Sequence, residues 1–139
     1  MSSHQKAHLL FVCVENSNRS QMAEAFARLH GGDDVAAYSA GSRPSGKINP
    51  KAVAAMKDKG VELSLHTSKG LTDLPHVQWD WVVTMGCGDE CPFLPAKHRD
   101  DWPLPDPRNM EGDEFNKVRD EIEQRVLTLL QIVKKEKTQ

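Results

Sequence analysis

The stretch FVCVENSNRSQMAEAF, from Phe11 to Phe26, joins a short apolar run to a segment with helical spacing. It places Cys13 six residues before Arg19, with a loop of five residues between them. A loop that leads from a strand into a helix N-terminus favours negative charge, because backbone N–H groups and the helix dipole both point at the ligand. The stretch therefore predicts an anion site beside a thiol.

The segments that follow alternate between strand and helix patterns. Short apolar runs predict buried strands at residues 8–14, 34–41 and 79–85, and a weaker strand is expected near Trp102. Helical spacing begins at Ser20, and Asn49 and Pro50 are typical of a helix start. The last predicted helix buries one face, made of Val118, Ile122, Val126, Leu129 and Val133. Such alternation predicts an α/β fold with a parallel sheet covered on both sides.

Length and composition limit the class of protein. The chain has 139 residues, 38% of them hydrophobic, which is enough for one core and hardly for two. We therefore expect a single domain over residues 1–139. A net charge of -2 without a long basic run argues against nucleic acid as a partner. We find neither a membrane span nor the apolar core of a signal peptide, so we expect a cytoplasmic protein.

Residues 14–18, called the anion loop below, offer several groups to a bound oxyanion. Their N–H groups can turn inward, and the planar fork of Arg19 can hold two oxygens. The charge of Arg19 also favours the thiolate form of Cys13, which the hydroxyl of Ser20 can steady. The alternative for Cys13 is a small buried residue at a strand end. The expected substrate-binding residues are Val14, Glu15, Asn16, Ser17, Asn18 and Arg19.

Several motifs together resemble the low-molecular-weight protein tyrosine phosphatases and the arsenate reductases that share their fold. The motifs are VCVENSNRSQMAE (12–24), YSAG (38–41), NPKAVAAM (49–56), HTSK (66–69), VVTMGCGDEC (82–91) and DP (106–107). The resemblance implies a four-stranded parallel sheet of flavodoxin-like topology with helices on both faces. It also implies that Cys13 is the nucleophile and that Asp106 protonates the leaving oxygen. Without the resemblance, Asp106 would be an ordinary turn residue before a proline.

The other two thiols separate the two branches of this family. In the reductase route that the resemblance implies, Cys13 bonds to arsenic, Cys87 attacks its sulfur and expels arsenite, and Cys91 then attacks Cys87. The disulfide thereby moves outward to an external thiol reductant, for which thioredoxin is our expectation, with no bound cofactor. Residues four apart on a helical turn have Cα atoms within the ~4.4 to 6.8 Å that a disulfide needs. Two alternatives remain for this pair: unrelated thiols, or a metal site, which lacks enough further ligands, so we expect no metal.

The chain departs from the family pattern at four places. Only three residues separate Cys87 from Cys91, fewer than in the well-known thioredoxin-linked reductases, so we expect the helix that carries them to be rebuilt. Asn18 stands where some members carry an extra cysteine. Glu15 puts a carboxylate in the anion loop, and we expect it to point outward. Arg108 stands near the position of an aromatic residue in tyrosine phosphatases, which disfavours a large aromatic substrate.

Some family members bind potassium behind the anion loop. Asn16, Glu24 and Ser39 match three of the positions involved, and the fourth, normally acidic, is Lys69. An ammonium group could stand where the ion would. We therefore expect no potassium site, and we predict that Glu24 and Lys69 form a pair.

Our hypothesis is an arsenate reductase that detoxifies arsenate with a Cys13, Cys87 and Cys91 relay, as an expected monomer. The first alternative is a low-molecular-weight phosphatase that hydrolyses phosphate monoesters through a phosphocysteine. The second is a phosphocysteine carrier, which would use the same loop to accept and pass on a phosphoryl group. A carrier would need neither Asp106 nor the two later cysteines.

Overall fold

The computed structural model describes residues 6–86 and 94–137, and its centre is one four-stranded parallel sheet. The strands are β1 (Ala7–Cys13), β2 (Val35–Gly41), β3 (Trp81–Thr84) and β4 (His98–Asp101), in the order β2-β1-β3-β4. This is the strand order of flavodoxin-like folds, whose ligands bind where the winding reverses, at the carboxyl ends of the first and third strands. The predicted α/β class, with one four-stranded parallel sheet of flavodoxin-like topology, is confirmed.

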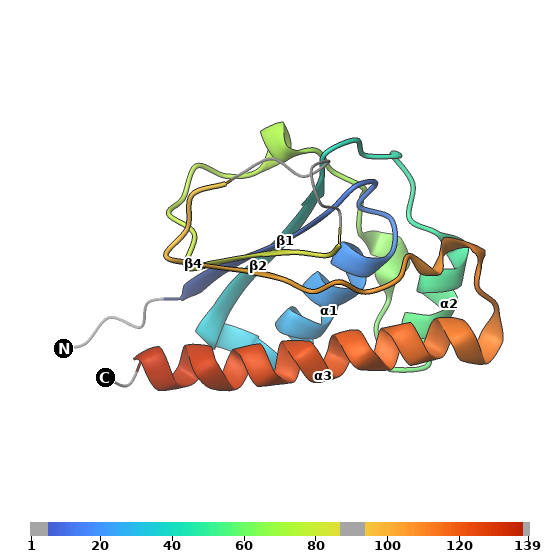
Figure 1. Cartoon of the computed structure of the whole chain (residues 1–139). Helices are drawn as coiled ribbons and strands as arrows, with labels where there is room; N and C mark the ends of the chain where they lie inside the picture. The colour runs from blue at the N-terminus through green and yellow to red at the C-terminus, as the bar shows by residue number, and fades with distance from the viewer. Residues whose placement is uncertain (1–5, 87–93, 138–139) are drawn as a thin grey trace.

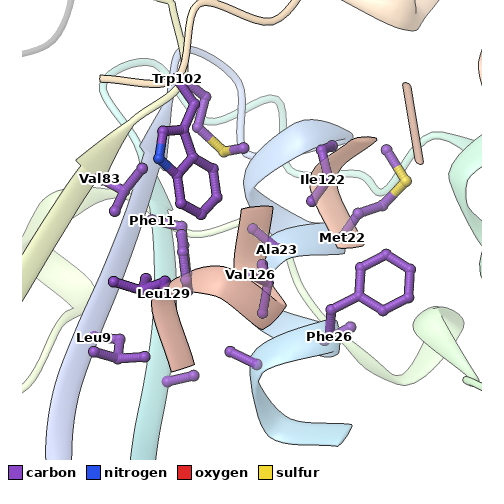
Figure 2. Close-up of a cluster of buried hydrophobic side chains, with 14 of the residues drawn as sticks. Leu9, Phe11, Met22, Ala23, Phe26, Val83, Trp102, Ile122, Val126 and Leu129 are labelled. Carbon is purple, nitrogen blue, oxygen red and sulfur yellow. The ribbon is translucent and has the colours of Figure 1, made fainter. Parts of the chain in front are cut away.

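The α-helices of the described residues pack against one face of the sheet (Figure 1). They are α1 (Arg19–Gly31), α2 (Pro50–Lys57) and α3 (Gly112–Lys137). Strand residues Leu9, Phe11 and Val83 meet the buried faces of α1 and α3 there (Figure 2). The predicted face of α3 is buried throughout, which confirms the periodicity.

The opposite face of the sheet differs from the expectation of helices on both sides. Among the described residues, a 3₁₀ turn at Leu71–Asp73 and the chain after it cover this face. Leu10, Val12, Ala40 and Val82 pack there against partly buried residues that include Leu71, Leu74, Val77, Leu94 and Ala96. Pro75 follows the turn closely, and proline cannot continue a helical hydrogen-bond ladder.

Local signals explain where the helix α2 and the strand β4 lie. The Asn49 side chain accepts a hydrogen bond from Lys51 N at 2.9 Å, and Pro50 occupies the first helical position, as the sequence predicts. Strand β4 is exposed at all four positions, which suits a short charged strand at a sheet edge. None of the described helices has the length and apolar character needed to cross a bilayer.

Replacing Ile122 by alanine tests the packing of α3 on the sheet. Ile122 is fully buried, so the loss of its side chain should lower the free energy of unfolding by about 2 to 5 kcal/mol. The control is Ile132→Ala on the same helix, because Ile132 is 42% exposed. Urea unfolding should separate the two variants clearly, and equal losses would contradict this packing.

Candidate active site

The carbonyl groups of the anion loop turn away from the site. The N–H groups of Ser42, Arg43, Ser45 and Asn49 donate to the carbonyls of Cys13, Val14, Glu15 and Ser17, at 3.2, 2.8, 3.1 and 3.1 Å respectively. Within the described part of the chain, no backbone hydrogen bond uses an N–H group of residues 14–19 as its donor. These N–H groups are therefore available to an anion, which is the arrangement of a backbone nest.

Gly41 lets the end of β2 pass directly beneath the anion loop. A Cβ atom at Gly41 would lie 2.5 Å from Val14 O and 2.9 Å from Asn16 N. Both are backbone atoms, so neither could move without reshaping the loop. Asn16 itself has a φ of 53°, a left-handed conformation that few residues other than glycine adopt.

The Asn16 side chain holds this conformation and reaches toward the thiol. Its Oδ1 accepts hydrogen bonds from Lys69 N at 2.7 Å and from Gln21 Nε2 at 2.8 Å. Its Nδ2 donates to Ser20 Oγ at 2.8 Å, and Ser20 Oγ lies 2.7 Å from Cys13 Sγ. Cys13 is only 3% exposed, and its sulfur is held by a chain of hydrogen bonds that begins at Lys69.

Gln21 is a site residue that the sequence analysis missed. It is fully buried at the start of α1, and its Nε2 also donates to Thr67 O at 2.8 Å. Its Oε1 lies 3.3 Å from His66 Nδ1. Gln21 thus ties the anion loop to residues 66–67. One sequence feature could have predicted this role: Gln21 lies on the buried face of an amphipathic helix, where a side-chain amide needs hydrogen-bond partners.

Arg19 is buried and held from two other segments. Its Nη1 donates to Met85 O at 2.5 Å and to Leu104 O at 2.9 Å. The first carbonyl follows β3, and the second belongs to the loop that leads to Asp106, orange in Figure 1. Both contacts fix the guanidinium plane before any ligand arrives, which suits two-pronged binding of an oxyanion.

Cys13 and Arg19 open into a cavity of about 430 Å³. Asp106 also lines this cavity, with Oδ2 at 4.0 Å from Arg19 Nη2 and Oδ1 accepting from Arg108 N at 3.0 Å. Two other candidate acids, Asp100 and Asp101, do not line this cavity. The lining residues are Cys13, Val14, Glu15, Ser17, Asn18, Arg19, Arg43, Gly86, Leu104, Pro105, Asp106 and Arg108.

Glu15 was expected to point outward from the anion loop, and its position agrees with this expectation only in part. The side chain is 40% exposed, yet it lines the cavity, and its Oε2 lies 2.9 Å from Arg108 Nη1. Arg108 therefore compensates the carboxylate that looked out of place in an anion loop. No local sequence pattern predicts this pair, because its members are 93 positions apart in the chain.

A buried carboxylate lies behind the anion loop. Glu24 accepts a hydrogen bond from Ser39 Oγ at 2.6 Å and pairs with Arg28 at 2.9 Å. The predicted contact with Lys69 is present at 3.5 Å. Burial lowers the pKa of His66 and outweighs the opposing pull of the Glu24 charge, so His66 is largely neutral at pH 7. Arg28 and Lys69 supply the positive charge that the buried Glu24 carboxylate needs.

Cys87 and Cys91, the two predicted relay thiols, lie outside the described residues. Gly86, which precedes Cys87 in the sequence, lines the cavity beside Arg19. Among the described residues, 6–86 and 94–137, no group of three or more His, Cys, Asp or Glu side chains is placed to hold a metal ion.

A loop that begins with a thiol, ends with an arginine and turns its N–H groups inward defines a class of enzymes that attack tetrahedral oxyanions with cysteine. Residues 8–139 match the family described as low molecular weight phosphotyrosine protein phosphatase, and the chain belongs to this family.

Within the family, the chain is similar to bacterial arsenate reductases. It is 43% identical over 120 residues to the arsenate reductase of Staphylococcus xylosus, covering 84% of this chain and 91% of the relative. It is 42% identical over 132 residues to that of Bacillus licheniformis, covering 87% and 93%.

The chain is also similar to solved structures of arsenate reductases. A structure described as an arsenate reductase in the phosphate binding state has a TM-score of 0.82 at 33% identity, covering 91% of this chain and 98% of the other. The thioredoxin-dependent arsenate reductase of Corynebacterium glutamicum has a TM-score of 0.78 at 32% identity, covering 97% of this chain and 65% of the other.

Replacing Gly41 by alanine tests the close approach beneath the anion loop. The added methyl group would clash with backbone atoms, so we expect weaker binding of inorganic phosphate and a lower free energy of unfolding. The control is Gly70→Ala, because Gly70 forms a bridge with Gly41 and a Cβ there would meet its nearest neighbour at an ordinary 3.4 Å. Calorimetric titration and urea unfolding measure both effects. Unchanged phosphate binding in Gly41→Ala would refute the contact's importance.

Proposed function

We propose that residues 1–139 form one catalytic domain that reduces arsenate to arsenite, with Cys13 as the nucleophile. The observation that carries this proposal is a cavity lined by both Cys13 and Arg19 beside a loop whose N–H groups are not used in backbone hydrogen bonds of the described chain, in a protein whose relatives are arsenate reductases. A tetrahedral oxyanion fits such a site, because its charge is met by fixed donors on several sides.

In the first step, the Cys13 thiolate attacks arsenic and an As–O bond breaks. The departing oxygen needs a proton, and Asp106 lines the cavity with Oδ2 at 4.0 Å from Arg19 Nη2, whereas Glu15, the other carboxyl group of the lining, is paired with Arg108. Asp100 and Asp101 are engaged elsewhere, since Asp100 Oδ2 accepts from Trp102 Nε1 and Asp101 Oδ1 accepts from Thr84 Oγ1. The oxygen leaves as water, and arsenic stays bonded to sulfur.

In the second step, the Cys87 thiolate attacks the Cys13 sulfur. The S–S bond forms as the S–As electron pair passes to arsenic, which is thereby reduced from As(V) to As(III) and leaves as arsenite. Cys91 then attacks Cys87, which restores the Cys13 thiolate and leaves a Cys87–Cys91 disulfide. Two electrons from a thiol reductant close the cycle. Thioredoxin is our proposal for that reductant, supported by the similarity to a thioredoxin-dependent arsenate reductase.

The second candidate activity is hydrolysis of phosphate monoesters. The family name and the similarity to a reductase solved in a phosphate binding state favour it, because phosphate and arsenate have the same shape and charge. Water would then break the phosphocysteine, and neither Cys87 nor Cys91 would take part. Two assays run in parallel decide between reduction and hydrolysis: the arsenate-dependent oxidation of reduced thioredoxin, and the hydrolysis of an aryl phosphate.

Asp106→Asn tests the proposed acid. The change keeps the shape of the side chain and removes the proton, so single-turnover reduction of arsenate should slow by about 100- to 10,000-fold. Binding of inorganic phosphate should change far less. Asp100→Asn is the control and should react at the normal rate. A normal rate in Asp106→Asn would assign the proton to another group.

Serine replacements of the later cysteines test the relay. Cys87→Ser should trap arsenic on Cys13 and block arsenite release, because no second sulfur attacks the adduct. Cys91→Ser should complete one turnover and stop as a Cys13–Cys87 disulfide, which an external thiol reaches poorly in a buried site. Mass spectrometry of peptides after one turnover identifies the joined sulfurs.

Two results would contradict the relay. Cys13→Ser must abolish turnover, so residual activity in that variant would remove the proposed nucleophile. Full multiple-turnover activity in Cys87→Ser/Cys91→Ser would show that an external thiol attacks the Cys13 adduct directly.

A further inference from the structure

Glu15 and Arg108 form an ion pair at the cavity that the proposed chemistry does not use. Glu15 Oε2 lies 2.9 Å from Arg108 Nη1, and both residues line the cavity that holds Cys13. Their side chains are 40% and 56% exposed, so the pair lies where the cavity meets solvent. Exposed pairs of this kind add little to folding stability, which makes a purely structural role a poor explanation.

The pair lies on the route that a substituent of the leaving oxygen would take. That oxygen must face Asp106 to receive its proton. Arg108 follows Asp106 by two residues, its N–H donates to Asp106 Oδ1 at 3.0 Å, and its Nη2 is 3.7 Å from Asp106 Oδ2. Any group attached to the leaving oxygen would therefore emerge beside the Arg108 guanidinium, which is tied across to Glu15.

Backbone contacts hold both partners in place. The Glu15 carbonyl accepts from Ser45 N at 3.1 Å and from Ser68 Oγ at 2.9 Å. On the other side, Lys51 Nζ donates to Arg108 O at 3.4 Å and to Met110 O at 3.0 Å. The two loops are thus fixed independently, and the side-chain pair closes the space between them.

The charges of Glu15 and Arg108 also affect an approaching oxyanion. An unpaired Glu15 carboxylate would repel any oxyanion that approaches Cys13, whereas the pair presents no net charge. A small inorganic oxyanion can still enter, because nothing needs to protrude past its fourth oxygen. An aryl or alkyl monoester would have to break the pair and would then meet the freed carboxylate.

We propose that the Glu15–Arg108 ion pair determines substrate specificity by admitting free inorganic oxyanions and excluding phosphate monoesters. The inference rests on the proposed function, because it assumes that the cavity binds the substrate oxyanion. It adds the class of substrate that the cavity rejects and the two side chains responsible.

The test compares two ligands in a Cys13→Ser background, where neither ligand can react. Isothermal titration measures the affinities for inorganic phosphate and for phenyl phosphate, with and without Glu15→Ala/Arg108→Ala. We expect the double replacement to strengthen phenyl phosphate binding by about tenfold or more, as when a pocket gains room for a substituent. The affinity for inorganic phosphate should change by less than about threefold, because the double replacement leaves the net charge of the cavity unchanged.

Single replacements separate obstruction from charge. Arg108→Ala leaves the Glu15 carboxylate unpaired, so inorganic phosphate should bind more weakly than in the parent. Glu15→Ala removes one negative charge from the cavity and leaves Arg108 with Asp106 as its remaining carboxylate partner, so inorganic phosphate should bind more tightly. The matched control is Glu121→Ala/Arg125→Ala, which removes an exposed pair of the same type, at 3.0 Å on α3, and should change neither affinity.

Two outcomes overturn the proposal and differ in what else they overturn. If the parent reduces arsenate and binds inorganic phosphate, but the ratio of the two affinities is the same after the double replacement, only the specificity role is lost. If the Cys13→Ser parent binds no inorganic phosphate and the unmodified chain reduces no arsenate, the proposed function falls together with the inference.

Discussion

The rest of the site depends on the hydrogen bonds that the segment after β2 donates to the carbonyl groups of the anion loop. A five-residue loop has as many carbonyls as N–H groups, and an anion tolerates only the latter facing it. The segment after β2 takes up the carbonyls of Cys13, Val14, Glu15 and Ser17, and it can do so only because Gly41 has no side chain. The selectivity of the loop for negative charge is thus created by a neighbouring strand end rather than by the loop's own side chains.

The same principle of fixing groups in advance applies to the charges. Arg19 lines the described cavity together with Cys13, and two carbonyl groups hold its guanidinium in place. The Glu24 carboxylate is kept away from the anion on the far side of the loop and is neutralised there by Arg28 and Lys69. A site whose guanidinium and N–H groups are held in place beforehand needs little rearrangement to accept an oxyanion.

Local patterns in the sequence predicted the elements and the position of Cys13, because burial periodicity and capping are properties of short segments. The motif residues Ser20, Asn16 and Lys69 lie together as expected for the same reason, since they flank strand ends at one edge of the sheet. The edge strand β4 gave only a weak signal, because all four of its residues are exposed. The partners of Arg19 and Glu15 could not be predicted, since a backbone carbonyl carries no sequence signature and the pairs span 66 to 93 residues.

The left-handed backbone of Asn16 has a consequence for the newly made chain. That conformation is disfavoured for an isolated residue, and here it is held by Lys69 N, which is 53 residues away in sequence. The N-terminal strand, loop and helix therefore cannot take their final shape until the middle of the chain has been synthesised and has docked. Until that moment Cys13 has none of these fixed donors around it, so the surroundings of its sulfur form only as the topology of the chain closes. Long-range contacts of this kind also slow folding, so the formation of the site is linked to the rate of assembly.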